Sequence, residues 1–238
     1  MTLREPRILL CDADGNLFPS EEPAFVASTE VTNRFLASLG VAERWEPDAL
    51  RLRATGRNFR ATALDLAAEH GVTVGEEALD GWVAEERRAV TAHLGAVLRP
   101  DPEVAGPVGR LGERFALAVV SSSALARLDA CFEATGLAAL FPADVRYSAE
   151  DSLPVPTSKP DPAIYALAGE RLGVAGDAGL AVEDAVPGVL SAVAAGFPCV
   201  GNLQFVTDPA EREARRAALL DAGAELVVES WAELGRHL

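Results

Sequence analysis

The sequence predicts an α/β protein in which helices cover both faces of a parallel sheet. Three short runs are apolar throughout, namely ILLC at 8–11, FALAVV at 115–120 and GLAV at 179–182. Such runs are typical of strands that are buried on both faces of a sheet. Helical patterns alternate with these strands, and that order favours parallel pairing with helices on either side.

A second observation predicts an inserted domain. Between residues 24 and 98 the chain shows only helical patterns, whereas strands and helices alternate before and after this block. We therefore expect an α/β core domain formed by residues 1–19 and 98–238, and an α-helical cap domain formed by residues 20–97.

Composition excludes several classes of function. The chain has 238 residues with 36 acidic and 21 basic side chains, a formal net charge of −15, and 49% apolar residues. The apolar content is typical of a globular protein, and the net charge argues against binding duplex nucleic acid, whose phosphates would repel it.

No apolar run approaches the roughly 18 residues of a membrane span, and two early aspartates argue against a signal peptide. We expect no membrane partner and a cytoplasmic location.

The cysteines agree with that expectation. Cys11, Cys131 and Cys199 are odd in number, far apart and without a CxxC pair. They are typical of free thiols in a reducing compartment rather than of a disulfide framework or a zinc site.

The elements follow in order along the chain. A short buried strand at 7–11 ends in Asp-Ala-Asp-Gly, and the cap is expected to hold a first helix ending at Gly40 and further helices over 59–70 and 76–93. Beyond Pro100 we expect, in order, a helix over 101–114, a strand over 115–120, a helix through 131, a helix over 162–172 with Asp161 as its N-cap, a strand over 179–182, a helix to 196, a strand over 197–201, and finally a helix, a short strand and a terminal helix.

Polar side chains follow several of these strands. Ligands of open parallel sheets bind at the carboxyl ends of the strands. Asp12 and Asp14 follow the first strand, Ser121 follows the second, and Glu183 and Asp184 follow GLAV. Lys159 precedes the helix over 162–172. Four segments therefore direct two pairs of carboxylates, a hydroxyl and an ammonium to one edge of the sheet.

Each feature taken alone has a purely structural explanation. Asp-Ala-Asp-Gly favours a turn, Ser121 is a common N-cap residue, and Lys159 is typical of a solvated surface. Glu183 and Asp184 suit the first turn of a helix, where the dipole favours acids. The structural explanations require four independent coincidences at one edge, so the joint arrangement favours a functional site.

The chemistry of such a set is restricted. Carboxylates that converge without cysteine or histidine favour a hard cation, and Mg²⁺ suits a site that handles phosphate. A carboxylate can attack phosphorus and form an aspartyl-phosphate, while a lysine, a hydroxyl and Mg²⁺ hold the charge of the phosphoryl oxygens. Asp14 returns to the side of Asp12 and can serve as general acid and then base. The three histidines lie in helical stretches, so Ser-His-Asp hydrolysis is not supported.

Four motifs resemble a known family. They are DADGNL at 12–17, VVSSS at 119–123, SKPDP at 158–162 and AVEDAVPG at 181–188. Their order and spacing are similar to those of the haloacid dehalogenase-like (HAD) hydrolase superfamily, across essentially the whole core. The helical block resembles the type-1 cap of the subgroup that includes phosphoglycolate phosphatase and β-phosphoglucomutase. The resemblance implies a Rossmann-like core and a small phosphorylated metabolite as substrate.

The resemblance also implies roles for single residues. Asp12 would be the nucleophile and Asp14 the general acid and base. Ser121 would hydrogen-bond the transferring phosphoryl group, assisted by the backbone at Ser122. Lys159 would bridge that group and the nucleophile.

A metal site is implied by the same motifs. Asp12, the backbone carbonyl of Asp14, and Asp184 would hold Mg²⁺, and Glu183 would serve as a ligand or as an acceptor behind the ligands. Dehalogenases of this fold lack an acid at the position of Asp14, because halide leaves without a proton, so its presence favours phosphate esters.

Two positions depart from the family pattern. Asn16 replaces the usual threonine of the first motif, and Pro19 stands where members of the subgroup often carry an acid. Pro19 puts the exact substrate class in doubt, because it lies in the segment that links core and cap.

The cap is expected to select the substrate by closing over the leaving group. Arg57, Asn58 and Arg60 lie where related caps present substrate-contacting residues, although arginines on an exposed helix are ordinarily only solvated. Trp45 and Trp82 are interpreted as packing residues of the cap.

Three hypotheses follow. The leading one is a Mg²⁺-dependent phosphatase that hydrolyses a small phosphorylated metabolite through an aspartyl-phosphate. The second is a β-phosphoglucomutase-like phosphotransferase that uses the same groups. The third is a non-catalytic binding protein on the same fold, motivated by Asn16 and Pro19.

Overall fold

The computed structural model describes residues 6–54 and 58–238, which fold as two compact units. The core unit comprises Met1–Pro19 and Leu98–Leu238, and the cap unit comprises Ser20–Val97. Each unit has its own apolar core.

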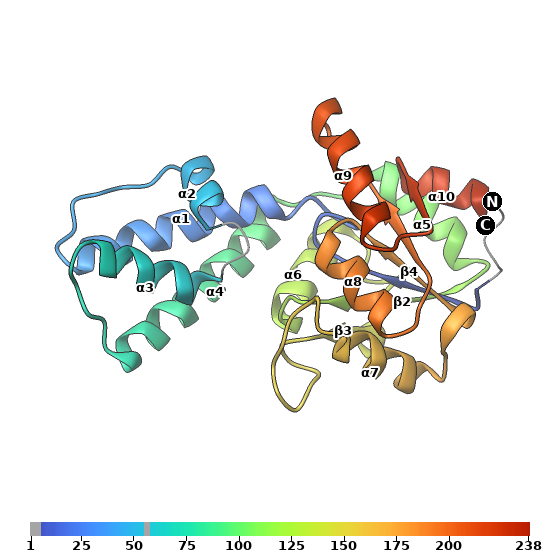
Figure 1. Cartoon of the computed structure of the whole chain (residues 1–238), viewed down its shortest axis with the longest axis horizontal. Coiled ribbons are helices and arrows are strands. Elements are labelled where there is room, and N and C mark those ends of the chain that lie inside the picture. The colour runs from blue at the N-terminus through green and yellow to red at the C-terminus, as the bar shows by residue number, and fades with distance from the viewer. Residues whose placement is uncertain (1–5, 55–57) are drawn as a thin grey trace. The chain divides into compact units, whose positions relative to one another are not determined.

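A six-stranded sheet forms the centre of the core unit (Figure 1). All strand pairs are parallel, in the order β3-β2-β1-β4-β5-β6. The strands are β1 (Ile8–Cys11), β2 (Ala116–Ser121), β3 (Arg146–Ser148), β4 (Gly179–Glu183), β5 (Cys199–Asn202) and β6 (Leu226–Val228). The predicted α/β fold with a parallel sheet is confirmed. β3 was not predicted, because three residues are too few to show a pattern.

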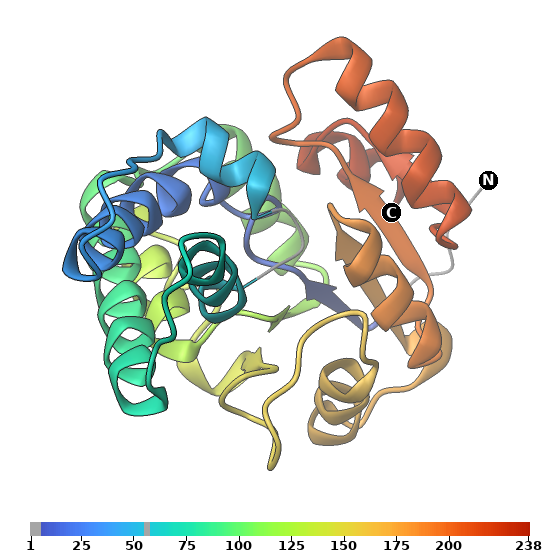
Figure 2. The same cartoon turned by 60° about the vertical axis from the view of Figure 1, so that its left-hand side comes forward.

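Helices cover both faces of this sheet (Figures 1 and 2). Leu10, Val120 and Ala181 point to the face covered by α7, α8 and α9, whereas Leu9 and Val119 alternate to the opposite face, where α5, α6 and α10 pack. The core helices are α5 (Pro102–Gly112), α6 (Leu125–Thr135), α7 (Ala163–Leu172), α8 (Val186–Ala194), α9 (Pro209–Asp221) and α10 (Trp231–His237). Both faces of the strands are buried, which is why their sequences are apolar throughout.

Local signals set the helix ends. The Asp101 side chain accepts a hydrogen bond from the Glu103 backbone N–H at the start of α5, and Gly173 ends α7 with φ 65°. α7 begins at Ala163, one residue after the predicted first position at Pro162, because Pro162 lies in a turn before it. Asp161 nevertheless accepts a hydrogen bond from the Ala163 N–H at 2.8 Å.

The cap unit consists of helices. They are α1 (Glu21–Ser38), α2 (Pro47–Arg53), α3 (Phe59–Glu69) and α4 (Glu76–Val97). Phe35, Leu50 and Leu66 are fully buried in its core, and Trp45 and Trp82 pack against them. The interpretation of both tryptophans as packing residues therefore agrees with the structure. Among the described residues, no helix has the length and apolar character that a membrane span requires.

Candidate active site

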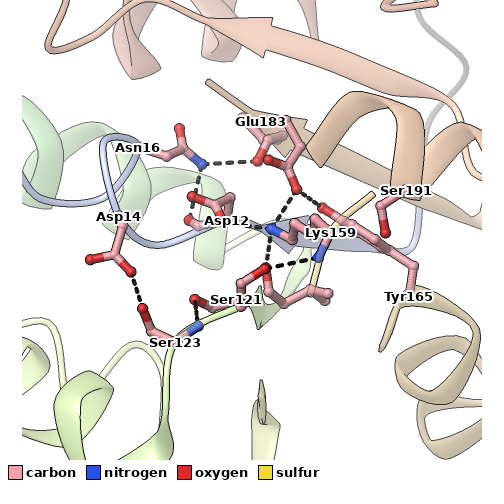
Figure 3. Close-up of polar contacts among 12 residues, drawn as sticks. Asp12, Asp14, Asn16, Ser121, Ser123, Lys159, Tyr165, Glu183 and Ser191 are labelled. Atoms are coloured by element: carbon pink, nitrogen blue, oxygen red, sulfur yellow. Dashed lines mark hydrogen bonds and ion pairs between the residues drawn. The ribbon is translucent and has the colours of Figure 1, made fainter. Parts of the chain in front are cut away.

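Segments from distant parts of the chain meet at the carboxyl ends of the central strands (Figure 3). β1 lies between β2 and β4 and is parallel to both. Asp12 directly follows β1, while Ser121 and Glu183 are the last residues of β2 and β4. All three side chains are buried, and Lys159 reaches those of Asp12 and Glu183 from the loop before α7.

The Lys159 ammonium connects three of the central strands. Its Nζ donates to Asp12 Oδ1 at 2.5 Å, to Glu183 Oε1 at 2.7 Å and to the Val120 carbonyl oxygen at 2.7 Å. These acceptors match the three donors of an ammonium group. The Lys159 side chain is 6% exposed, so its position is determined by the protein rather than by solvent.

The pKa shifts in this group follow from its composition, since two buried carboxyls surround one ammonium. Burial alone would lower the pKa of Lys159, but Asp12 and Glu183 outweigh burial and raise it. Burial raises the pKa of the Asp12 carboxyl, and Lys159 only partly opposes that effect. The pKa of Glu183 is likewise raised by burial against the opposing effect of Lys159. When both are ionised, the two buried carboxylates around one ammonium leave one negative charge in excess, and burial raises their pKa values because it disfavours this charge.

A third carboxylate increases that excess. Carboxylate oxygens of Asp12, Glu183 and Asp184 lie within 4.8 Å of one another. With Lys159 charged, the three ionised carboxylates leave two negative charges, which a divalent cation would neutralise, and oxygen donors suit Mg²⁺. Gly15, with φ 77°, lies against Asp184, and a Cβ at this position would overlap the Asp184 carboxylate. These residues therefore fit Mg²⁺. The backbone carbonyl of Asp14 as a further ligand stays a prediction.

Glu183 is held from two further sides. Tyr165 of α7 donates its hydroxyl hydrogen bond to Glu183 Oε1. Gly188 of α8 lies so close that a Cβ there would overlap the Glu183 carboxylate. Burial raises the pKa of Tyr165 well above its usual range, so the phenol remains a proton donor. Sequence reasoning did not identify Tyr165; its only signal is its place in the first turn of the helix that follows Lys159.

The three serines after β2 have different partners. Ser121 Oγ accepts from the Ser123 backbone N–H at 3.0 Å, and Ser122 Oγ accepts from the Lys159 backbone N–H at 3.1 Å. Ser123 Oγ donates to Asp14 Oδ2 at 2.6 Å. Ser121 and Ser122 thus lie at the expected edge, and the roles assigned to them stay predictions.

Two contacts of the Asp14 carboxylate involve residues outside the Lys159 group. Its Oδ1 accepts from Arg127 Nη2 at 2.8 Å, in addition to the contact with Ser123 (Figure 3 shows the latter). Ser123 and Arg127 were both missed by sequence reasoning, although the serine lies within a motif and the arginine follows four residues later.

The departure at Asn16 has a structural explanation. Its Nδ2 donates to the carbonyl oxygens of Asp12 and Val182 at 3.0 and 2.9 Å, and its Oδ1 accepts from Asn202 Nδ2 at 2.8 Å. Asn16 is fully buried, and its hydrogen bonds connect the loop after β1 to β4 and β5. Pro19 is exposed, and nothing in the structure explains its departure.

The cap candidates have local partners. Arg57 lies outside the described residues. Asn58 accepts from the Ala61 backbone N–H at 2.9 Å as the N-cap of α3, and Arg60 forms an ion pair with Asp80. The substrate role assigned to these three residues stays a prediction.

Comparison with known proteins adds independent information. Residues 6–196 match the family model described as haloacid dehalogenase-like hydrolase. The protein CbbY from Cereibacter sphaeroides is 32% identical over 236 residues, which cover 95% of this chain and 93% of CbbY.

Solved structures are similar over nearly the whole chain. A CbbY variant from Rhodobacter sphaeroides in complex with xylulose-1,5-bisphosphate is 25% identical with a TM-score of 0.70, and 97% of each chain is covered. A putative β-phosphoglucomutase from Thermotoga maritima is 26% identical with a TM-score of 0.69 and the same coverage.

Proposed function

Because the chain belongs to the haloacid dehalogenase-like hydrolase family, we propose that it hydrolyses a small phosphate monoester through an aspartyl-phosphate on Asp12. Family membership makes the chain an enzyme of the hydrolase class rather than the non-catalytic binding protein considered above. The relative crystallised with xylulose-1,5-bisphosphate supports a phosphorylated sugar as the substrate class. The three free, buried cysteines are typical of proteins in a reducing compartment and support a cytoplasmic location.

One observation carries this proposal. The Asp12 carboxylate lies buried at the end of β1, 2.5 Å from Lys159 Nζ and beside two further carboxylates that fit Mg²⁺. A buried carboxylate beside both a fixed ammonium and a cation site is suited to attack a phosphoryl group, whose negative oxygens need compensating charge.

The chain's own residues account for the steps. Asp12 forms a bond to phosphorus while the ester P–O bond breaks, and the departing oxygen takes a proton from Asp14. Asp14 then takes a proton from the water that attacks the aspartyl-phosphate, and this attack releases phosphate and restores Asp12. The Ser121 hydroxyl, with the backbone at Ser122, holds the phosphoryl oxygens, and the positive charge of Lys159 beside Asp12 stabilises them. Mg²⁺ held by Asp12 and Asp184, with Glu183 beside them, would supply positive charge that lowers the repulsion between carboxylate and phosphate.

A second function is favoured by one comparison. The similarity to a putative β-phosphoglucomutase keeps a phosphotransferase as the alternative, because a mutase uses the same nucleophile and acid. The two differ in the acceptor of the phosphoryl group, which is water in one case and a sugar hydroxyl in the other.

The test is phosphate release from a panel of sugar phosphates and bisphosphates, with MgCl₂ and with EDTA. We expect metal-dependent release that Asp12→Asn lowers about a thousandfold or more, because the variant lacks the nucleophile. Asp221→Asn, an exposed position at the end of α9, is the matched control and should retain activity.

Three outcomes would count against the proposal. Full activity of Asp12→Asn would exclude the aspartyl-phosphate. Isomerisation of a sugar phosphate without phosphate release would favour the phosphotransferase. No turnover in either assay would overturn both functions.

A further inference from the structure

Both oxygens of the Asp14 carboxylate are held by one segment of the chain. Oδ2 accepts from Ser123 Oγ at 2.6 Å, and Oδ1 accepts from Arg127 Nη2 at 2.8 Å. Ser123 lies in the loop after β2, and Arg127 lies in the first turn of α6. A planar carboxylate with a defined donor at each oxygen has little freedom to rotate.

The donors are themselves anchored. The Ser123 backbone N–H donates to Ser121 Oγ, and the first N–H of α6, from Leu125, donates to Asp151 Oδ2 at 2.6 Å. Further along α6, Asp129 accepts from Arg146 Nη1 at 2.5 Å. The helix that carries Arg127 is therefore fixed at its start and in its middle.

The contact with Arg127 fixes the carboxylate more than it fixes the loop. The side chains of Arg127 and Asp14 are 24% and 20% exposed, so water competes only in part for this ion pair. The backbone of the loop that carries Asp14 is held by other contacts, from Asn16 and from the hydrogen bond between the Gly15 N–H and the Phe18 carbonyl oxygen at 3.0 Å. The direct consequence of the contact with Arg127 is the orientation of the Asp14 carboxylate.

Orientation matters for the group that transfers protons. A general acid must lie within hydrogen-bond reach of the leaving oxygen, and small displacements cost a large part of the rate. We propose that Arg127 is a positioning residue that, with Ser123, orients Asp14 for proton transfer to the leaving group. This inference rests on the proposed function, since it concerns the acid of that reaction.

Two matched substrates distinguish a loss of proton transfer by Asp14 from a general loss of activity. p-Nitrobenzyl phosphate and p-nitrophenyl phosphate have the same charge and nearly the same size. When the P–O bond of the benzyl ester breaks, the strongly basic benzyl alkoxide requires a proton, whereas p-nitrophenolate departs without one. Their values of kcat/KM report the transfer of the phosphoryl group to Asp12, before water enters the reaction.

We expect Arg127→Met to lower kcat/KM about 10- to 100-fold on the benzyl ester, a part of what a general acid contributes. On the phenyl ester the loss should stay below about threefold. Arg127→Lys retains a cation and should restore part of the loss on the benzyl ester. Asp14→Asn should show the same split more strongly.

The control is Glu133→Gln, which changes an exposed side chain of α6 and leaves Asp14, its two donors and the anchors of the helix in place. It should affect both esters equally, and the thermal midpoints of all variants check that they are folded. Equal losses on both esters in Arg127→Met, or no loss on either, would overturn the positioning role while leaving the phosphatase proposal intact. Failure of the proposed function would be recognised separately, by the absence of phosphate release from the panel of sugar phosphates.

Discussion

The side chain of Asn16 shows how one residue stabilises the loop that carries the proposed nucleophile. Its amide donates to two backbone carbonyls and accepts from Asn202, all in a fully buried position. Buried polar groups that lose their partners are costly, because water cannot replace them. The geometry of the loop between Asp12 and Asp14 therefore depends on the amide pair formed by Asn16 and Asn202.

We expect Asn16→Ala to lower the free energy of unfolding by about 2–4 kcal/mol, since it leaves the buried Asn202 amide without this partner. Urea unfolding of Asn16→Ala, Asn202→Ala and the double variant measures the coupling between the two residues. The double variant should be more stable than the sum of the single effects predicts, by about 0.5–3 kcal/mol. Additive effects would contradict the amide pair.

The start of helix α8 is the element that most closely restricts the site. α8 begins at Val186, two residues after Asp184, and Gly188 in its first turn lies against the Glu183 carboxylate. Glu183 in turn contacts Lys159, which contacts Asp12. The backbone of one helix thus limits the space available to the charged group.

Gly188→Ala is expected to destabilise the protein by about 1–3 kcal/mol, because the added methyl group displaces the Glu183 carboxylate. This outcome opposes the intrinsic preference for alanine in a helix, which favours the substitution by about 1 kcal/mol. Gly109→Ala in α5 is the matched control, because a Cβ there meets no atom within 4 Å. Thermal unfolding should show a loss at Gly188 and a gain at Gly109, and a gain at both positions would refute the predicted overlap.

At the scale of the whole molecule, negative charge is the dominant property. The chain carries a formal net charge of −15, and three carboxylates of the core lie together, two of them paired with one ammonium. Salt of any kind screens the general repulsion, whereas a site of defined geometry distinguishes a divalent cation from a monovalent one. The response of folding to different cations therefore separates the two effects.

We expect MgCl₂ in large excess over its Kd to raise the thermal midpoint by about 5 °C or more, since binding at 100 times Kd stabilises by about 2.7 kcal/mol. NaCl at the same ionic strength should have a smaller effect. Asp184→Asn should lose the difference between the two salts. Equal shifts with both salts in the native protein would show charge screening and no metal site.

Much of the site was predictable because parallel strands end at a common edge. Asp12, Glu183 and Asp184 each adjoin the end of an apolar run, and the pairing of β1 with β2 and β4 is enough to bring them close. Lys159 was identified from the helix that follows it. These inferences need only the order of strands and helices, which hydrophobic patterning reveals.

The contacts of Asp14 and Glu183 were not predictable in this way. Arg127 contacts Asp14 from the first turn of α6, although the two residues are 113 positions apart in the sequence. Tyr165 contacts Glu183 from α7, 18 positions away. Such contacts depend on how each helix packs on the sheet and on the rotamer of a long side chain. Neither property leaves a periodic signal in the sequence.

The sequence by itself therefore determined the α/β class, the inserted helical block, the family resemblance and the candidate groups at the strand ends. Only the tertiary structure decided which donor meets which carboxylate oxygen: Lys159 between Asp12 and Glu183, and Arg127 with Ser123 on Asp14. Hydrophobic periodicity is a local property and survives in the sequence, whereas the partner of a charged side chain is selected by distances of a few ångströms between segments that folding brings together.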